Sequence, residues 1–319
     1  MKRRIAIFVL FLWMLPISAW AADYLVPVGS LVGLQLRTDS ITVAAFDDTL
    51  GAAARDAGLK IGDRITAVNG APAQSIEDMK AMLQKTDGPV KLSVTRGSRN
   101  LTLQLTPGQE GGQRVLGVYL RQGISGIGTV TWYDPETKQF AALGHGVSTG
   151  KEGLLRLVSG DIFPAEVYSV RKGAAGNPGL LKGQALSPIP IGTVSSNTPR
   201  GIFGTTSAGF SGSPIPVGEW NALHTGPATI LATVSQGPPR EYSVEILKLY
   251  PKDRTTYRNF LLKVTDPELL NTTGGIVQGM SGSPILQDGK LIGAVTHVLV
   301  NDPTSGYGIF IENMLEAAG

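Results

Sequence analysis

A serine set between two glycines is the feature of this sequence best suited to chemistry. Residues 279–284 read Gly-Met-Ser-Gly-Ser-Pro, and a short apolar segment, a turn at residues 288–289 and a second apolar run follow. A serine hydroxyl can attack a carbonyl carbon, and Gly279 allows the backbone to turn its N–H groups toward the carbonyl oxygen. We therefore predict acyl transfer with Ser281 as nucleophile and the N–H groups of Gly279 and Ser281 as the oxyanion hole.

A nucleophilic serine needs a general base, and the chain has three histidines. His145 lies between two glycines at the end of a predicted hairpin, a setting that exposes the imidazole and allows another segment to approach it. His297 falls in the apolar run 292–300, where the alternation favours a structural or pocket-lining role. His224 lies in a loop without such features. We expect His145 to be the base.

A carboxylate that orients the imidazole is harder to choose. Four acidic residues of the same region are candidates: Asp266, Asp161, Asp134 and Glu166. Residues 266–268 read Asp-Pro-Glu, which is also typical of a helix N-terminus. The residues alone leave this position open.

A second serine competes for the role of nucleophile. Residues 209–214 read Gly-Phe-Ser-Gly-Ser-Pro and repeat the pattern around Ser281. Ser211 leads into Pro-Ile-Pro, which cannot form a regular strand ladder, whereas Ser281 precedes a predicted hairpin with an Asp-Gly turn. We therefore favour Ser281 and interpret Ser283 as a hydrogen-bonding neighbour.

Composition limits the classes of protein and cofactor. The 319 residues are 42% hydrophobic and 17% charged, and 41 glycines and 20 prolines are spread between short apolar runs, which predicts a mainly β globular fold. The net charge of +3 is scattered, so we expect no nucleic-acid partner. The absence of cysteine excludes disulfides, thiolate metal sites and a cysteine nucleophile. The predicted chemistry requires no metal or organic cofactor.

The N-terminus predicts export. Residues 2–4 are basic, residues 5–21 are mainly apolar, and residues 19–21 read Ala-Trp-Ala, which is typical of a signal-peptide cleavage site. The apolar run has a length between that of a signal peptide and that of a membrane span. Residues 1–21 are therefore a cleaved signal peptide or a retained membrane anchor.

Residues 24–107 read as a β-β-α-β-α-β unit, with a capping box at Ser75 opening the second helix. Residues 54–70, Ala-Arg-Asp-Ala-Gly-Leu-Lys-Ile-Gly-Asp-Arg-Ile-Thr-Ala-Val-Asn-Gly, resemble the central signature of PDZ domains. The resemblance implies a loop that binds a peptide carboxylate through backbone N–H groups, followed by a strand that pairs with the peptide. Leu31, Val32, Gly33 and Leu34 are the matching segment.

The remainder, residues 113–319, follows a joint rich in glycine and glutamine. The hairpin after Ser281 and the segment Gly-Tyr-Gly-Ile at 306–309 resemble the specificity-pocket walls of chymotrypsin-like enzymes, which implies a double β-barrel with Gly306 and Tyr307 lining the pocket. Residues 143–146, 274–285 and above all 293–308 resemble the stage IV sporulation protein B peptidases of endospore-forming bacteria. That resemblance covers nearly the entire chain.

The family resemblance implies a serine endopeptidase with Ser281, His145 and Asp266 as its catalytic set, and Asp161 is the next choice for the acid. It implies a protease exported from the forespore into the space between the two sporulation membranes. There it would cut a membrane-bound regulator of an intramembrane protease, which activates a late sigma factor, and would also cut itself. The PDZ unit would hold a peptide of its own chain or of a partner. Two alternatives are a non-catalytic PDZ peptide sensor and a general envelope quality-control protease.

Overall fold

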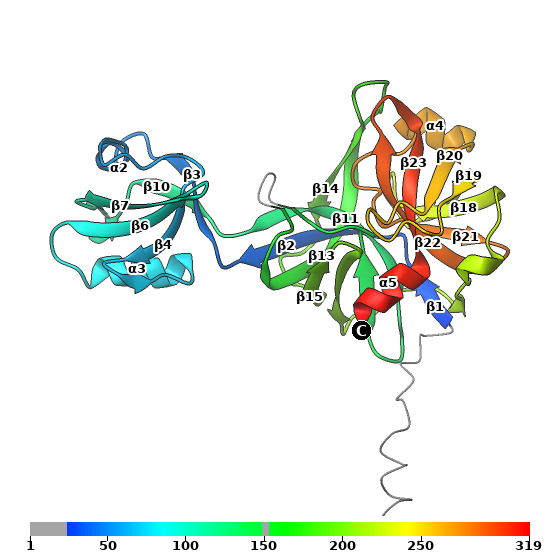
Figure 1. Ribbon diagram of the computed structural model, residues 1–319, viewed down its shortest axis with the longest axis horizontal. Helices are drawn as coiled ribbons and strands as arrows, with labels where there is room; N and C mark the ends of the chain where they lie inside the picture. Colours follow the sequence, from blue (N-terminus) through cyan, green and yellow to red (C-terminus); the bar gives the residue numbers. More distant parts are fainter. Residues whose placement is uncertain (1–23, 149–152) are drawn as a thin grey trace, which may run out of the picture.

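Two closed β-barrels and one smaller sheet make up the protein in a computed structural model, which describes residues 24–148 and 153–319 (Figure 1). The mainly β fold predicted from the sequence is confirmed. The predicted signal or anchor segment, residues 1–21, lies outside the described residues. Within the described ranges, no helix has the length and apolar character needed to cross a bilayer.

The first barrel has six strands, and its closure depends on the pairing of β11 with β12. In order around the barrel the strands are β12 (Gln139–Ala142), β16 (Gly201–Thr206), β15 (Gly192–Thr198), β13 (Leu157–Arg171), β2 (Leu31–Thr38) and β11 (Ile124–Tyr133). Strands β1 (Tyr24–Pro27) and β17 (Ile215–Pro216) extend this sheet, and β14 (Leu180–Ala185) forms a hairpin with β13. Alternation in β2 places Leu34 and Leu36 in the core and leaves Gln35 and Arg37 outside.

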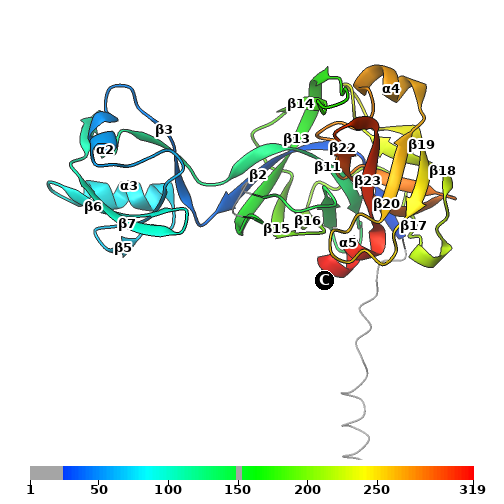
Figure 2. The same cartoon turned by 45° about the horizontal axis from the view of Figure 1, so that its top comes forward.

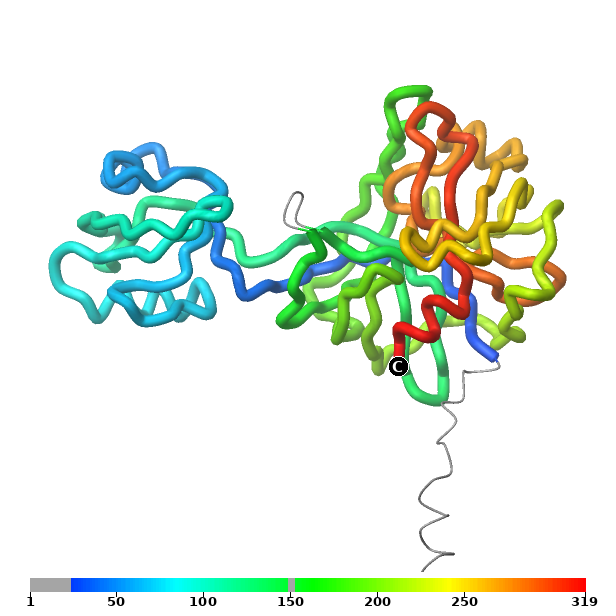
Figure 3. The backbone as a smooth tube through the Cα atoms, viewed as in Figure 1, coloured from blue at the N-terminus to red at the C-terminus, as the bar shows by residue number. Residues whose placement is uncertain are grey.

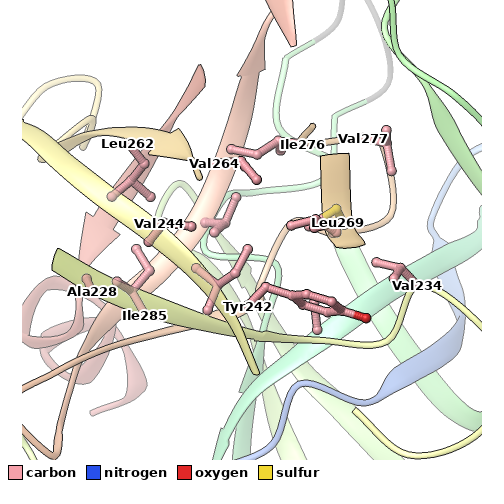
Figure 4. Packing of buried hydrophobic residues seen from close by; sticks show 14 of the residues in the cluster. Ala228, Val234, Tyr242, Val244, Leu262, Val264, Leu269, Ile276, Val277 and Ile285 are labelled. Atoms are coloured by element: carbon pink, nitrogen blue, oxygen red, sulfur yellow. The ribbon is translucent and has the colours of Figure 1, made fainter. Parts of the chain in front are cut away.

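The second barrel is also closed and six-stranded. Its strands are β18 (Gly226–Ala232), β19 (Arg240–Leu249), β20 (Phe260–Val264), β23 (Asp302–Phe310), β22 (Lys290–Leu299) and β21 (Pro284–Gln287). Tyr242 and Val244 of β19 alternate inward and pack with Ile285 of β21 (Figure 4). The 3-10 turn η2 (Trp220–Ala222) and the helices α4 (Pro267–Thr273) and α5 (Ile311–Ala318) complete this half.

The smaller sheet belongs to the PDZ unit. Its strand order is β10 (Val118–Arg121), β3 (Ile41–Phe46), β4 (Arg64–Val68), β6 (Val90–Arg96) and β7 (Arg99–Leu105), with β5 (Ala71–Pro72) beside β4. The helices are α2 (Ala52–Asp56) and α3 (Ile76–Gln84), and β8 (Gly108–Glu110) pairs with β9 (Gln113–Val115). The predicted cap of α3 is present, since the Asp78 N–H donates to Ser75 Oγ.

The PDZ unit is an insertion into a hairpin of the first barrel. Strand β2 continues into β3 and β10 continues into β11, while β2 pairs with β11 and β3 pairs with β10. The chain therefore crosses between the two parts twice, side by side (Figures 2 and 3). This differs from the predicted boundaries of 24–107 and 113–319, because residues 24–38 belong to the barrel and the PDZ sheet extends to Arg121. The alternating apolar residues of β2 are compatible with a strand of the PDZ sheet and with a strand of the barrel. Only the strands that pair with β2, which are distant in the sequence, assign it to the barrel.

Candidate active site

The two barrels meet at a cavity of about 430 Å³ that contains both predicted reacting side chains. His145 enters from the loop after β12, and Ser281 enters from the turn before β21. The other walls come from both barrels and include Leu34, Ile124, Gly126, Ile127, Gly279, Thr296, His297 and Val298. The structure thus brings together residues separated by more than 130 positions in the sequence.

Backbone hydrogen bonds hold the turn that carries Ser281. The Ser283 N–H donates to the Met280 carbonyl at 3.0 Å, and the Gly282 N–H donates to the Val295 carbonyl at 2.7 Å. The Ser281 hydroxyl donates to the Thr296 carbonyl at 2.7 Å. The Ser283 hydroxyl is buried without a hydrogen-bond partner in the described part, so it is not the side-chain neighbour that the sequence suggested.

Gly279 gives the oxyanion hole its shape. Its φ is +101°, and a Cβ there would lie 3.0 Å from Leu181 Cβ and 3.3 Å from Ile127 Cδ1. Among residues 24–148 and 153–319, no acceptor is bonded to the N–H of Gly279 or of Ser281. Both predicted donors are therefore available to a substrate oxygen.

The tautomer of His145 follows from its one hydrogen bond within the described residues. Its Nδ1 lies 3.0 Å from the Gly146 carbonyl oxygen, which can only accept, so Nδ1 carries the proton and Nε2 is left with a lone pair. Burial lowers the pKa of His145, and the bond to Gly146 opposes this only in part. The ring is therefore neutral at pH 7, with Nε2 able to accept a proton.

Asn197 holds the loop that carries His145. Its Oδ1 accepts from the Val147 N–H at 2.8 Å, and its Nδ2 donates to the carbonyls of Val147 and Leu155 at 2.9 and 2.8 Å. This residue was not predicted from the sequence, because an asparagine between Ser196 and Thr198 near a proline is typical of an ordinary turn. No local signal identifies it.

The predicted triad acid does not meet the histidine. Asp266 is the N-cap of α4: its Oδ1 accepts from the Leu269 N–H at 3.0 Å, and its Oδ2 accepts from the Ser243 N–H at 3.3 Å. The helix-start pattern at residues 266–268, and not the orientation of an imidazole, explains this aspartate. The other three candidates also have partners elsewhere: Asp161 pairs with Arg37, Glu166 accepts from Gln184, and Asp134 accepts from Glu136 and Thr137.

His297 is the second histidine of the cavity. Its ring centroid lies 4.9 Å from that of His145, and the two planes are inclined by 39°. Burial of the ring lowers the pKa of His297 to about 4, and repulsion from Arg258 and, at the acidic pH where it is protonated, from His145 adds to this. The residue keeps an exposed outer side. Of the two roles that the alternation suggested, the structure assigns the pocket-lining one.

The remaining predicted site residues lie elsewhere. Gly306 is packed behind the cavity wall, where an added Cβ would lie 2.6 Å from Ile276 Cδ1, and the Tyr307 ring lies under the Arg258 guanidinium. Ile276 and Val298, and not this pair, line the cavity. Ser211 lies exposed in the loop between β16 and β17, outside the cavity.

The predicted carboxylate-binding segment of the PDZ unit is also corrected. Leu31, Val32, Gly33 and Leu34 lie in β2, which pairs with β11 on one edge and β13 on the other, so no edge is left for a peptide. The matching apolar-Gly-apolar loop is residues 116–118, Leu-Gly-Val, which enters the edge strand β10. Gly117 has a φ of +68° and lies so close to the Leu50 carbonyl that a Cβ would clash at 2.1 Å. The sequence pattern was therefore sound, but it was assigned at the wrong end of the PDZ unit.

Models of two protein families match the two parts of the chain. The model of the SpoIVB peptidase S55 family matches residues 112–315, and a PDZ domain model matches residues 50–96. No curated protein matches the chain. Among solved structures, the PDZ domain of the SdrC-like protein Lmo2051 from Listeria monocytogenes is 22% identical, covers 26% of this chain and 87% of that chain, and has a TM-score of 0.23.

Two crystal structures of Rv3671c also match, both described as the inactive form. The Rv3671c protease is 15% identical over 60% of this chain and 82% of that one, with a TM-score of 0.36. A serine-to-alanine mutant of Rv3671c from M. tuberculosis H37Rv is 14% identical over 60% and 79%, also with a TM-score of 0.36. The family model covers more than half of the chain, and Ser281 and His145 share one cavity. The chain therefore belongs to the SpoIVB peptidase S55 family of serine peptidases and carries a PDZ domain.

Proposed function

We propose that this serine peptidase is a signalling protease of sporulation. It is exported across the cytoplasmic membrane into the space around the developing forespore, where residues 1–21 act as a signal peptide or anchor. It cuts a membrane-bound regulator of an intramembrane protease, so that a late sigma factor is activated, and it also cuts its own N-terminal region. Family membership and the PDZ domain support this proposal.

The observation that supports catalysis most directly is the shared cavity of Ser281 and His145. The Ser281 hydroxyl rotates away from the Thr296 carbonyl and gives its proton to His145 Nε2 as Oγ attacks the scissile carbonyl carbon. The N–H groups of Gly279 and Ser281 hold the oxyanion, and His145 returns the proton to the leaving amine. Water then releases the acyl group by the same route.

The first experiment compares residues 22–319 as wild type, Ser281→Ala and Ser211→Ala. We expect a serine-reactive fluorophosphonate to label the wild type and Ser211→Ala, and to leave Ser281→Ala unlabelled. Self-cleavage should follow the same pattern. Labelling of Ser281→Ala but not of Ser211→Ala would move the nucleophile to Ser211, and no labelling of any form would leave a peptide-binding protein.

The second experiment separates signalling from general proteolysis. The wild-type protein is incubated with unfolded model proteins and with a folded extracellular domain of a candidate membrane regulator. A signalling protease cuts the folded domain at one or two sites and spares the unfolded proteins. Broad degradation of the unfolded proteins would instead indicate a quality-control protease of the envelope.

A further inference from the structure

One edge of the strand pair that links the PDZ unit to the first barrel is unpaired. In the described structure β10 pairs only with β3, and residues 124–128 of β11 pair only with β2, since the contact of β11 with β12 begins at Val130. Because β2 continues into β3 and β10 into β11, the free edge is on the same side in both strands. An exposed strand edge offers N–H and C=O groups to another chain.

One end of this edge lies at the catalytic cavity. The Thr129 N–H donates to the Ser281 carbonyl at 3.2 Å, and the Thr129 hydroxyl donates to the Gly279 carbonyl at 2.8 Å. Ile127, two residues earlier, lines the cavity beside Gly279. A peptide on this edge therefore passes the nucleophile and the oxyanion hole.

The other end lies at the loop of residues 116–118. The N–H groups of Leu116 and Gly117 have no acceptor within the described residues. Arg114 lies just before this loop, where its guanidinium donates to the carbonyls of Thr86 and Gly88. Free backbone N–H groups in such a loop are suited to a carboxylate, and Arg114 adds a positive charge to the same part of the PDZ unit.

Helix α3 forms a second wall along β10. At one end of the helix, the Ile76 N–H donates to Gln122 Oε1 at 3.0 Å. At its other end, Gln84 exchanges two hydrogen bonds with the backbone of Arg114, each of 2.9 Å. The half-buried apolar side chains Ile76, Met82, Val118 and Leu120 lie on these two elements. These side chains pack against the core of the PDZ unit and keep part of their apolar surface exposed. We infer that a peptide on the free edge would lie over this apolar surface between α3 and β10, which we call the groove.

A hollow joins the groove to the catalytic cavity. It has a volume of about 720 Å³, and Ile76, Leu120, Gln122, Ile124 and Ser125 are among its lining residues. Ile124 also lines the catalytic cavity. The hollow and the cavity therefore adjoin at Ile124, the first residue of β11. Strands β10 and β11 run from the PDZ unit into the barrel (Figure 1).

The direction of these strands decides the polarity of a bound peptide. A peptide antiparallel to β10 and β11 runs from Ser281 toward Gly117 in its own N-to-C direction. We propose that the substrate binds as one extended segment, with its scissile bond at Ser281 and its free C-terminal carboxylate at residues 116–118. This rests on the proposed protease function and adds a substrate class to it: polypeptides cut at a fixed distance from their C-terminus.

The geometry sets that distance. Ten positions separate Gly117 from Ile127. Paired strands advance together at about 3.3 Å per residue, so the part of the substrate after the scissile bond should contain about ten residues and span about 33 Å. A shorter tail cannot reach the loop, and a longer tail must bulge out of the groove.

The test uses a fluorogenic cleavable core selected from a randomised peptide library with the wild-type protein. Tails of about 4, 7, 10, 13 and 16 residues follow the core, each made as the free acid and as the amide. For a tail of about ten residues, we expect kcat/KM of the free-acid peptide to exceed kcat/KM of the amide peptide by about tenfold. For the shortest tail, we expect the two forms to have the same kcat/KM. Equal values for acid and amide at every length, with cleavage still dependent on Ser281, would overturn this inference and leave the protease function intact. Failure of the wild type to cut any library peptide would overturn both.

Two variants locate the effect in the groove. Leu120→Lys places a charge in the apolar groove, whereas Thr102→Lys places the same charge on β7, at the opposite edge of the PDZ sheet. For each variant, kcat/KM of the free-acid peptide is divided by kcat/KM of the amide peptide. A smaller fraction of active protein lowers both values equally and leaves their ratio unchanged. We expect the ratio to fall to about one in Leu120→Lys and to keep its wild-type value in Thr102→Lys. An unchanged ratio in Leu120→Lys would contradict the proposal.

Discussion

The imidazole rings of His145 and His297 lie 4.9 Å apart between centroids and join the two barrels across the catalytic cavity. Burial lowers the pKa of His145. Burial also lowers the pKa of His297 to about 4, with repulsion from Arg258 and from His145 when that ring is protonated. At pH 7 both rings are neutral. In the cavity that Ser281 shares with His145, the predicted base is therefore neutral, and no carboxylate of residues 24–148 or 153–319 is bonded to its ring.

Activity should persist below the pH at which an ordinary histidine is protonated. His145 acts as a base only when it is neutral, and a lowered pKa keeps it neutral as the pH falls below the usual value of 6.5. The acid limb of the kcat/KM profile should thus lie below pH 6.5. A limb at or above that pH would mean that the ring is solvated or paired with an acid in the working enzyme.

Removal of His297 should shift the same profile. In His297→Ala water reaches the face of His145 that His297 now covers, so the pKa of His145 rises toward its usual value and the acid limb moves to higher pH. His224→Ala is the control, because His224 is exposed and bonds to Asp288 outside the cavity. Superimposable pH profiles of His297→Ala and the wild type would show that the ring contact has no influence on the base.

Loss of Asn197 should reduce turnover more than substrate binding. Asn197→Ala removes the described partners of the Val147 N–H and the Leu155 carbonyl and leaves the Val147 carbonyl only its bond from the Leu155 N–H. This should lower the free energy of unfolding by about 1–3 kcal/mol and loosen the position of the base. We expect kcat to fall and KM to change little. Ser196→Ala changes a neighbour whose side chain has no such bonds and should resemble the wild type. A rise in KM with unchanged kcat would contradict the positioning role.

Substitutions of Asp266 separate a structural role from a catalytic one. Asn is as good an N-cap as Asp and loses only the long bond from the Ser243 N–H, so Asp266→Asn should keep most of the stability. Asp266→Ala should lower the free energy of unfolding by about 1 kcal/mol. We expect both folded variants to keep kcat/KM within about threefold of the wild type. A loss of about 10³-fold or more in Asp266→Asn, with unchanged thermal stability, would return Asp266 to the catalytic set.

Much of the fold could be predicted from local patterns. The capping box at Ser75, the PDZ signature and the turn around Ser281 each depend on neighbouring residues, and the corresponding elements are present. The assignment of β2 could not be predicted, because its alternation suits any half-buried sheet and its partners lie about 90 to 130 positions away. For the same reason the sequence did not show that the PDZ unit is inserted into a hairpin of the barrel.

The residues of the candidate site also differ in whether a local sequence pattern indicates them. Ser281 and His145 have flanking glycines that indicate their exposure, and both lie in the cavity. For Asp266 the family resemblance implied a catalytic acid, and the Asp-Pro-Glu pattern indicated a helix N-cap. The structure shows the N-cap. For His297 the alternation of its strand left a structural and a pocket-lining role open, and the structure assigns the second. Asn197 acts through contacts with a loop far away in the sequence, so residue type and spacing gave no indication of its place in the site.

Gly279 offers the sharpest test of the oxyanion hole. Valine there would have to adopt a φ of +101°, and its Cβ would lie 3.0 Å from Leu181 Cβ, so the N–H groups of residues 279 and 281 would turn away from the substrate oxygen. Loss of one oxyanion donor typically costs about 10²–10³ in kcat, and we expect Gly279→Val to lose at least that much. Gly289→Val is the matched control, because Gly289 has a φ of +73° but open space where its Cβ would be. Both variants carry backbone strain, so both should lose stability, but only Gly279→Val should lose turnover per folded molecule. Near-normal kcat in folded Gly279→Val would show that the oxyanion is held by other groups.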